Sequence, residues 1–234
     1  MKRFWQAAAV TPEGGVALDG RPVRTPGRTA LILPTMALAD AVAAEWNAVG
    51  ATIDPRAMPL TGLANAAVDR VAPDPAAFAA GLARYGESDL LCYRAAEPAP
   101  LTERQTAAWD PVIAWAERRY DIHIAVTTCI IHQAQPASTV ARLGQAITAL
   151  DPFALAAASP IVTITGSLLL TLALIEGASM PDAVWAAAHV DEDWQIEMWG
   201  EDALATQARA HRRAEFDGAI RFLTLSRGAV PTQG

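Results

Sequence analysis

The chain has 234 residues, of which 52% are hydrophobic, and its formal net charge at pH 7 is −7. This length allows one large domain or two small ones, and the apolar content excludes an intrinsically disordered chain. The acidic balance argues against nucleic-acid binding, which needs a basic surface, but it is compatible with a basic protein partner. Abundant alanine, the strongest helix former, favours a mostly helical fold.

The sequence contains no evident targeting or membrane segment. The N-terminal residues Met-Lys-Arg-Phe-Trp lack the apolar core of a signal peptide. The most apolar stretch, 161–175, is interrupted by polar residues and falls short of the ~20 residues that span a bilayer, so we expect a helix buried in a bundle. Two cysteines, Cys92 and Cys129, are too few for a secreted disulfide scaffold and are interpreted as reduced, buried thiols. These features favour a cytoplasmic protein without stable membrane insertion.

The first 33 residues predict short antiparallel strands joined by turns. Asp19-Gly20 is the strongest hairpin signal, and Pro26-Gly27 marks a second turn. The apolar and β-branched runs between the turns predict strands over residues 4–10, 16–18, 22–25 and 29–33.

Helical periodicity dominates from Thr35, which is expected to cap a helix over 35–49. Trp46 lies in line with the apolar face of this helix, and we expect it to pack the helix against the sheet. Further helices are expected over residues 60–71, 74–85, 102–120, 138–149, 151–158, 160–176, 181–199 and 201–225.

The segment 122–131 interrupts the helical pattern because it is rich in β-branched residues, which favour strands. It is interpreted as a possible late strand that joins the N-terminal sheet. The sequence therefore predicts an α+β fold with a β-rich domain over 1–70, containing one or two helices, and a helical domain over 71–234.

An acidic segment over 191–202 contains six acids and two tryptophans. In a helix, Asp193, Glu197 and Glu201 share one face, where like charges destabilise the helix by a few tenths of a kcal/mol per pair. Three interpretations are open: a solvated face, an external cationic partner, or an internal network with arginines that follow the segment. The arginines considered for such a network are Arg209, Arg212 and Arg213.

Three residue patterns contain side chains that could bind a metal or catalyse a reaction. His189, Glu192 and Asp193 have a spacing that could present metal ligands from one helical face, which makes a metal-dependent hydrolase the alternative function. Glu192 with Glu197 could form an acid/base pair. Cys129 near His132 is a weak nucleophile motif, and a buried thiol is the stronger interpretation. We expect no catalytic residue, metal or cofactor.

Nine stretches, in order and with consistent spacing, resemble one protein family. They are Leu18-Asp-Gly-Arg-Pro-Val-Arg-Thr-Pro26, Leu33-Pro-Thr35, Ala44-Glu-Trp46, Met58-Pro-Leu-Thr61, Asp89-Leu-Leu-Cys-Tyr-Arg94, Gln105, Trp109-Asp-Pro111, His189-Val-Asp-Glu-Asp-Trp-Gln195 and Trp199-Gly200. The family is the group of chaperones that assemble the catalytic sector of ATP synthase. The resemblance is to the member that handles the alpha subunit in mitochondria and alphaproteobacteria.

The resemblance implies a chaperone without enzymatic activity that binds the unassembled alpha subunit. It prevents aggregation of that subunit until the beta subunit takes its place. Acids near the C-terminal end of the family fold are implicated in function, and the candidates here are Glu197, Glu201 and Asp202, with Trp199 as an apolar contact. Relatives often have an acid four residues after the tryptophan, where this chain has Ala203, so the choice among the acids stays open.

The resemblance and the absence of a presequence together favour a bacterial member that acts in the cytoplasm. For eukaryotic relatives, the resemblance implies the mitochondrial matrix. We expect the free protein to be monomeric.

Overall fold

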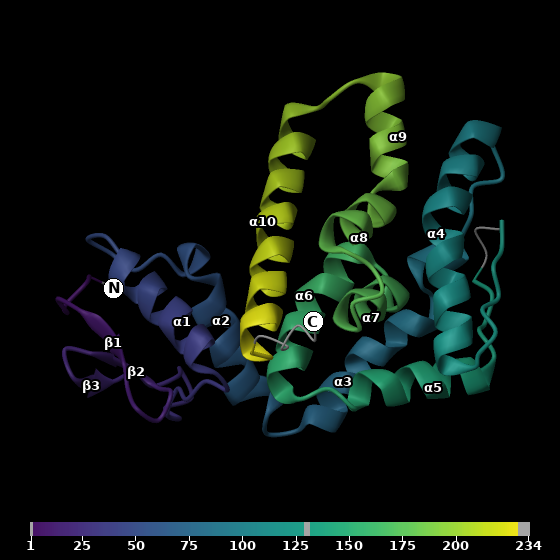
Figure 1. Ribbon diagram of the computed structural model, residues 1–234. Coiled ribbons are helices and arrows are strands. Elements are labelled where there is room, and N and C mark those ends of the chain that lie inside the picture. The colour runs from purple at the N-terminus through teal and green to yellow at the C-terminus, as the bar shows by residue number, and fades with distance from the viewer. Residues whose placement is uncertain (1, 129–131, 229–234) are drawn as a thin grey trace, which may run out of the picture. The chain divides into compact units, whose positions relative to one another are not determined.

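The computed structural model describes residues 2–128 and 132–228, and the chain has an α+β fold in which a small sheet precedes the helices (Figure 1). Two compact units are present. The first comprises Met1–Pro75, Asp151–Ala157 and Ala214–Gly234, and the second comprises Ala76–Leu150 and Ala158–Arg213.

The first segment of the first unit ends at Pro75, and two helices are divided between the units. Helix α6 (Pro152–Thr165) and helix α10 (Ala203–Ser226) each contribute one end to the first unit and the other end to the second. The amphipathic pattern of a helix does not reveal such a change of partner along its length.

The sheet contains strands β1 (Ala8–Val10), β2 (Val16–Leu18) and β3 (Arg21–Pro22) in the order β1-β2-β3, and both pairs are antiparallel. The expected strand over 4–10 is reduced to its last three residues. The expected strand over 29–33 is present only as isolated bridges, because Ile32 pairs with Gly15 and Ala30 with Arg24.

The predicted hairpin turn at Asp19-Gly20 is confirmed. Both residues have positive φ, 47° and 79°, the combination that suits the twist of adjacent antiparallel strands. The Asp19 carboxylate also accepts hydrogen bonds from the backbone N–H groups of Gln6 and Ala7. These hydrogen bonds lower the pKa of Asp19.

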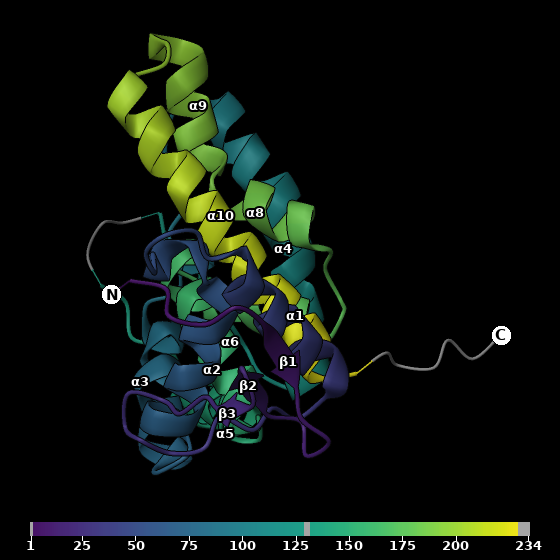
Figure 2. The same ribbon diagram turned by 90° about the vertical axis from the view of Figure 1, so that its left-hand side faces the viewer.

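Helix α1 (Met36–Ala48) lies against β1, as Figures 1 and 2 show. Thr35 caps it as predicted, because its hydroxyl accepts the N–H of Leu38 at 3.1 Å. At the other end, Trp46 contacts Trp5 edge to face with ring centroids 5.2 Å apart, and the Trp5 indole donates to the Trp46 carbonyl. The Trp5–Trp46 contact joins α1 to the segment that leads into the sheet.

The remaining helices of the first half begin with Pro55–Ala57 (η1), α2 (Pro59–Ala66) and its π-helical continuation Ala67–Val71 (η2). They continue with α3 (Pro75–Ala83), the short 3₁₀ helices Arg84–Glu87 (η3) and Leu90–Cys92 (η4), and α4 (Ala99–Tyr120). The second half contains α5 (Ala137–Thr148), α6, α7 (Leu168–Ile175), α8 (Pro181–Ala188), α9 (Val190–Trp199) and α10.

The expectation of one continuous helix over 160–176 is wrong. Gly166 takes φ +64°, and Ser167 starts α7 by accepting the N–H of Leu170 at 3.0 Å. The buried carboxylate of Asp89 accepts the N–H of Leu169 at the same helix start. The burial expected over 161–175 is confirmed for α7, whose eight residues are all buried, whereas Thr163 in α6 is exposed.

The β-branched segment 122–131 does not extend the N-terminal sheet in its described part. One parallel bridge joins Thr127 to Tyr93, and Arg94 donates its N–H to the Thr127 carbonyl. Residues 129–131, which include Cys129, lie outside the described residues. Over 2–128 and 132–228, no helix combines the length and apolarity that a membrane span requires.

Candidate protein-binding site

Helix α9 and the beginning of α10 form a hairpin whose connection is residues 200–202 (Figures 1 and 2). Gly200 ends α9 with φ +85°, a conformation that glycine adopts without strain. Asp202 then caps α10, because its carboxylate accepts the N–H of Ala205 at 2.8 Å. Residues 197–204 are all exposed, and we call them the hairpin end.

Large apolar side chains are exposed at the hairpin end. Trp199 is 78% exposed, Leu204 is 77% exposed and Met198 is 50% exposed. Glu201 and Asp202 lie between them in the sequence. Exposed apolar side chains next to polar groups are typical of protein-interaction sites, and tryptophan is over-represented among the residues that dominate such interactions.

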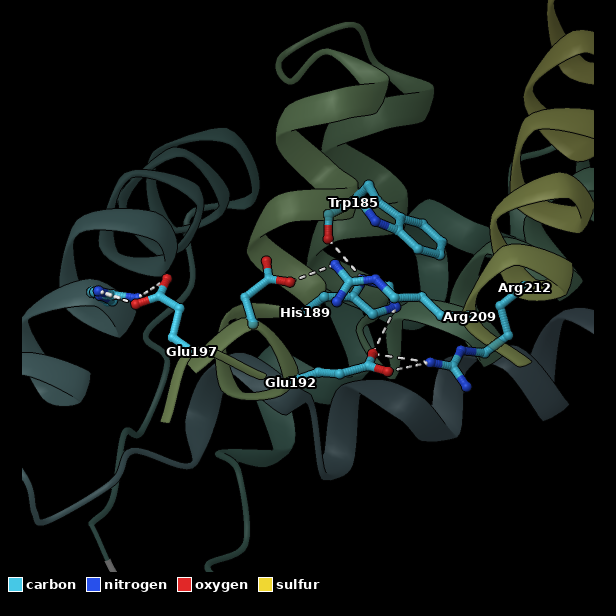
Figure 3. A network of polar contacts seen from close by, with 8 residues as sticks. Trp185, His189, Glu192, Glu197, Arg209 and Arg212 are labelled. Atoms are coloured by element: carbon cyan, nitrogen blue, oxygen red, sulfur yellow. Dashed lines mark hydrogen bonds and ion pairs between the residues drawn. The ribbon is translucent and has the colours of Figure 1, made fainter. Parts of the chain in front are cut away.

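The acids of α9 are largely engaged by arginines of the same unit. On the side of α10, the Nη2 of Arg209 lies 2.5 Å from the Oδ1 of Asp193. The Nη2 of Arg212 lies 2.9 Å from both carboxylate oxygens of Glu192 (Figure 3). Arg213 pairs with Asp182 instead. Two acids of the segment, Glu192 and Asp193, therefore form the internal ion pairs with arginines that were one interpretation of the sequence.

On the opposite side, α4 holds α9 through adjacent residues. Arg104 donates to both carboxylate oxygens of Glu197, at 2.7 and 2.8 Å. The Gln105 side chain donates to Asp191 at 2.7 Å. The hydrogen bonds from Arg104 lower the pKa of Glu197, and the same contact raises the pKa of Arg104.

The acidic segment thus divides into two groups. Asp191, Glu192, Asp193 and Glu197 make side-chain contacts with α4 or α10. Within the described residues, the ion pairs do not include Glu201 or Asp202, and Asp202 accepts only the backbone contact of a cap. The hairpin end therefore presents negative charge beside exposed apolar surface.

His189 is a structural residue between α8 and α9. Its ring is 5% exposed and stacks on Trp185 with centroids 3.8 Å apart, and its Nδ1 donates to the Trp185 carbonyl at 2.8 Å (Figure 3). Burial lowers the pKa of His189, which keeps the imidazole neutral near pH 7.

The geometry does not support the metal-dependent hydrolase considered from the sequence. Glu192 lies near His189, with its Oε2 3.8 Å from Nε2 of the imidazole, but it also pairs with Arg212. Asp193 pairs with Arg209 instead, so the three side chains do not converge on a common point. In the described part of the chain, no three histidine, cysteine, aspartate or glutamate side chains are grouped as metal ligands. Glu192 and Glu197 are bound by arginines of different helices, which does not suit an acid/base pair (Figure 3).

One of the two cysteines, Cys92, lies within the described residues and fits the predicted buried thiol. Cys92 is buried, and burial raises its pKa to about 12, so the thiol stays protonated and unreactive near neutral pH. Cys129, which the sequence places near His132, lies outside the described residues.

Sequence reasoning missed Arg104 and the structural role of Gln105. The two residues precede Trp109, whose indole donates to the Ala187 carbonyl at 2.7 Å and ties α4 to α8. Gln105 and Trp109 share one helical face by their spacing, and this signal was available. The pairing of Arg104 with Glu197 joins residues 93 positions apart, which no local pattern reveals.

These features define a class of protein: an α+β protein in which exposed apolar and acidic side chains are grouped at the end of a helical hairpin. The chain matches the family model of the ATP12 chaperone protein over residues 2–117. It is similar to the crystal structure of Atp12 from Paracoccus denitrificans, with 42% sequence identity, a TM-score of 0.90, and coverage of 97% of this chain and 98% of that chain.

Two further solved structures agree. A mutant form of the Paracoccus denitrificans protein matches with 43% identity and a TM-score of 0.90 over 97% of this chain and 98% of that chain. The Atu1473 protein of Agrobacterium tumefaciens matches with 39% identity and a TM-score of 0.88 over 95% of this chain and 85% of that chain. The chain belongs to the ATP12 chaperone family, and the predicted role as an assembly chaperone of ATP synthase is confirmed.

Proposed function

We propose that this chaperone binds the unassembled alpha subunit of ATP synthase through the hairpin end, with Glu197, Trp199, Glu201 and Asp202 as contact residues. Binding covers surface that later faces the beta subunit and prevents aggregation until that subunit takes its place. The family membership supports the chaperone role.

One observation supports the choice of surface. Trp199 is 78% exposed and lies beside Glu201, an acid without an ion-pair partner among the described residues. A solvated helix end that served only folding would not need an exposed tryptophan. An apolar contact with acids around it suits a client that presents apolar surface next to basic groups.

The proposal includes three further points. The chaperone acts by binding and without catalysis, it acts in the bacterial cytoplasm, and it is monomeric when free. The similarity to a bacterial chaperone structure over nearly the whole chain supports the bacterial setting.

The test is the double variant Glu201→Gln with Asp202→Asn. The melting temperature should stay nearly unchanged, because exposed acids contribute little to stability and asparagine is as good a helix cap as aspartate. Aggregation of free alpha subunit in the presence of the variant should rise. Protection by the unmodified protein should also weaken with salt, because ions screen charges beyond ~8 Å at physiological ionic strength.

A matched control is Glu13→Gln with Asp54→Asn. Both acids are exposed, and Asp54 caps a helical turn as Asp202 does. This control removes the same charge from the other unit and should protect the alpha subunit normally. Normal protection by the Glu201/Asp202 variant would show that the hairpin end is not the binding surface.

A further inference from the structure

Helix α9 is attached to its neighbours without a buried side chain of its own. Its contacts with α10 include the ion pairs Asp193–Arg209 and Glu192–Arg212. Toward α4 the two helices are separated by a groove of about 490 Å³, lined mainly by alanines of α4 and α8 together with Val190. The polar contacts on its two flanks therefore contribute to holding α9 in position.

Arg104 spans the groove close to the hairpin end. Arg104 and Glu197 both line the groove, and the two parallel hydrogen bonds between them join α4 to the last turn of α9. The guanidinium carbon of Arg104 also lies 4.9 Å from the centroid of the Trp194 ring. A planar guanidinium that pairs with both oxygens and covers an aromatic ring fixes orientation as well as distance.

We propose that Arg104 is a positioning residue of the binding surface: it holds the last turn of α9, and with it Trp199, in the orientation that binds the client. This inference rests on the function proposed above. It changes the role of Glu197 from the direct client contact proposed above to a support at the base of that surface, where Arg104 donates to both of its carboxylate oxygens.

The physical reason is the entropy of ordering. Without Arg104, α9 keeps its ion pairs with α10 and the Gln105–Asp191 hydrogen bond. Its last turn loses the two hydrogen bonds that join Glu197 to α4. A mobile surface must be ordered when the client binds, and that cost reduces affinity. Both partners of the pair are about half exposed, so the pair adds little to global stability.

The experiment compares capture of purified alpha subunit by Arg104→Gln, by Glu197→Gln and by the charge-swapped double variant Arg104→Glu/Glu197→Arg. We expect each single variant to weaken capture by about twofold to fivefold, the range associated with one partly exposed ion pair. The swapped variant should restore most of the loss, because it rebuilds the pair with reversed charges. Amide hydrogen exchange should rise over 194–200 in Arg104→Gln and return in the swapped variant.

Arg119→Gln is the matched control. Arg119 lies on the same helix, pairs with Glu176 at 2.5 Å, and has its guanidinium 5.3 Å from the Tyr120 ring centroid. The Arg119→Gln variant should capture the alpha subunit normally and should show unchanged amide hydrogen exchange in α9. An equal loss of capture in Arg119→Gln would attribute the effect to general loosening of α4 and overturn the positioning role.

The outcomes separate this inference from the proposed function. If the swapped variant stays as weak as Glu197→Gln while the Glu201/Asp202 variant also fails to protect, Glu197 contacts the client directly and the positioning role is overturned. If Arg104→Gln captures normally, the positioning role is also overturned. If the Glu201/Asp202 variant protects normally but the swap restores capture, the contact residues were chosen wrongly and the role of Arg104 stands.

Discussion

Helices α7 and α9 belong to the same unit but are held in opposite ways. Every residue of α7 is buried, whereas α9 has no fully buried residue, and ion pairs and a side-chain hydrogen bond join it to its neighbours. Apolar burial contributes far more to stability than surface ion pairs do. Substitutions in α7 should therefore unfold the protein, and substitutions around α9 should change binding while the fold remains.

The largest effect is expected from Leu169→Ala in α7. Leu169 has no exposed surface, and removing a buried leucine side chain leaves a cavity that costs roughly 2–5 kcal/mol. Denaturant titration of the variant and the unmodified protein measures this loss in the free energy of unfolding. A cost below about 0.5 kcal/mol would contradict the burial of α7.

A pH effect of similar size is expected at the start of the same helix. Asp89 is 1% exposed, and burial raises its pKa from 3.8 to about 6, although the N–H groups of Leu91 and Leu169 donate to the carboxylate. Between these values the folded state holds a proton that the unfolded state releases. Protonated Asp89 therefore contributes to the free energy of unfolding in full below about pH 4. This contribution, roughly 3 kcal/mol at most, is lost as the pH rises through about 6.

The variant Asp89→Asn isolates this contribution. Its absolute stability should fall, because the amide replaces an oxygen that accepts backbone N–H groups. The difference in unfolding free energy between the unmodified protein and the variant should shrink as the pH rises from 4 to 7. Parallel pH profiles for the two proteins would show that Asp89 does not titrate in this range.

A smaller effect is expected from Arg209→Gln with Arg212→Gln on the α10 side of α9. The two lost pairs should lower the free energy of unfolding by less than about 2 kcal/mol, because partly exposed pairs contribute little each. Amide exchange should rise in α9 and stay unchanged in α7. Equal increases in both helices would contradict the separation of α9 from the apolar core.

The smallest effect is expected from Leu204→Ala at the hairpin end. Leu204 is 77% exposed, so the free energy of unfolding should change by less than about 0.5 kcal/mol. The same denaturant titration that is used for Leu169→Ala measures it. A loss of more than about 1 kcal/mol would mean that Leu204 packs within the protein rather than facing a partner.

Local signals predicted the parts of the fold that local chemistry controls. The hairpin turn at Asp19-Gly20, the Thr35 cap and the burial of 168–175 follow from residue type and spacing. The break at Gly166 was missed because an apolar run looks the same in one helix or two. The sequence pattern did not reveal that Asp89, 80 positions away, caps the second helix.

The candidate site was predictable in composition but not in pairing. The acidic segment correctly indicated a need for cations, because Arg209 pairs with Asp193 and Arg212 pairs with Glu192. Arg104 was missed, because nothing near it in the sequence points to Glu197. Pairing across distant helices follows from packing of the whole unit, which spacing alone does not encode.

Site-specific photo-crosslinking tests the central claim most directly. A photoreactive phenylalanine analogue replaces Leu204 at the hairpin end or, as a control, Phe4, which is 65% exposed in the other unit. The proposed binding surface predicts a covalent adduct with the alpha subunit from position 204 and not from position 4, and less adduct when the beta subunit is added. An adduct from position 4 alone, or equal adducts from both positions, would contradict binding through the hairpin end.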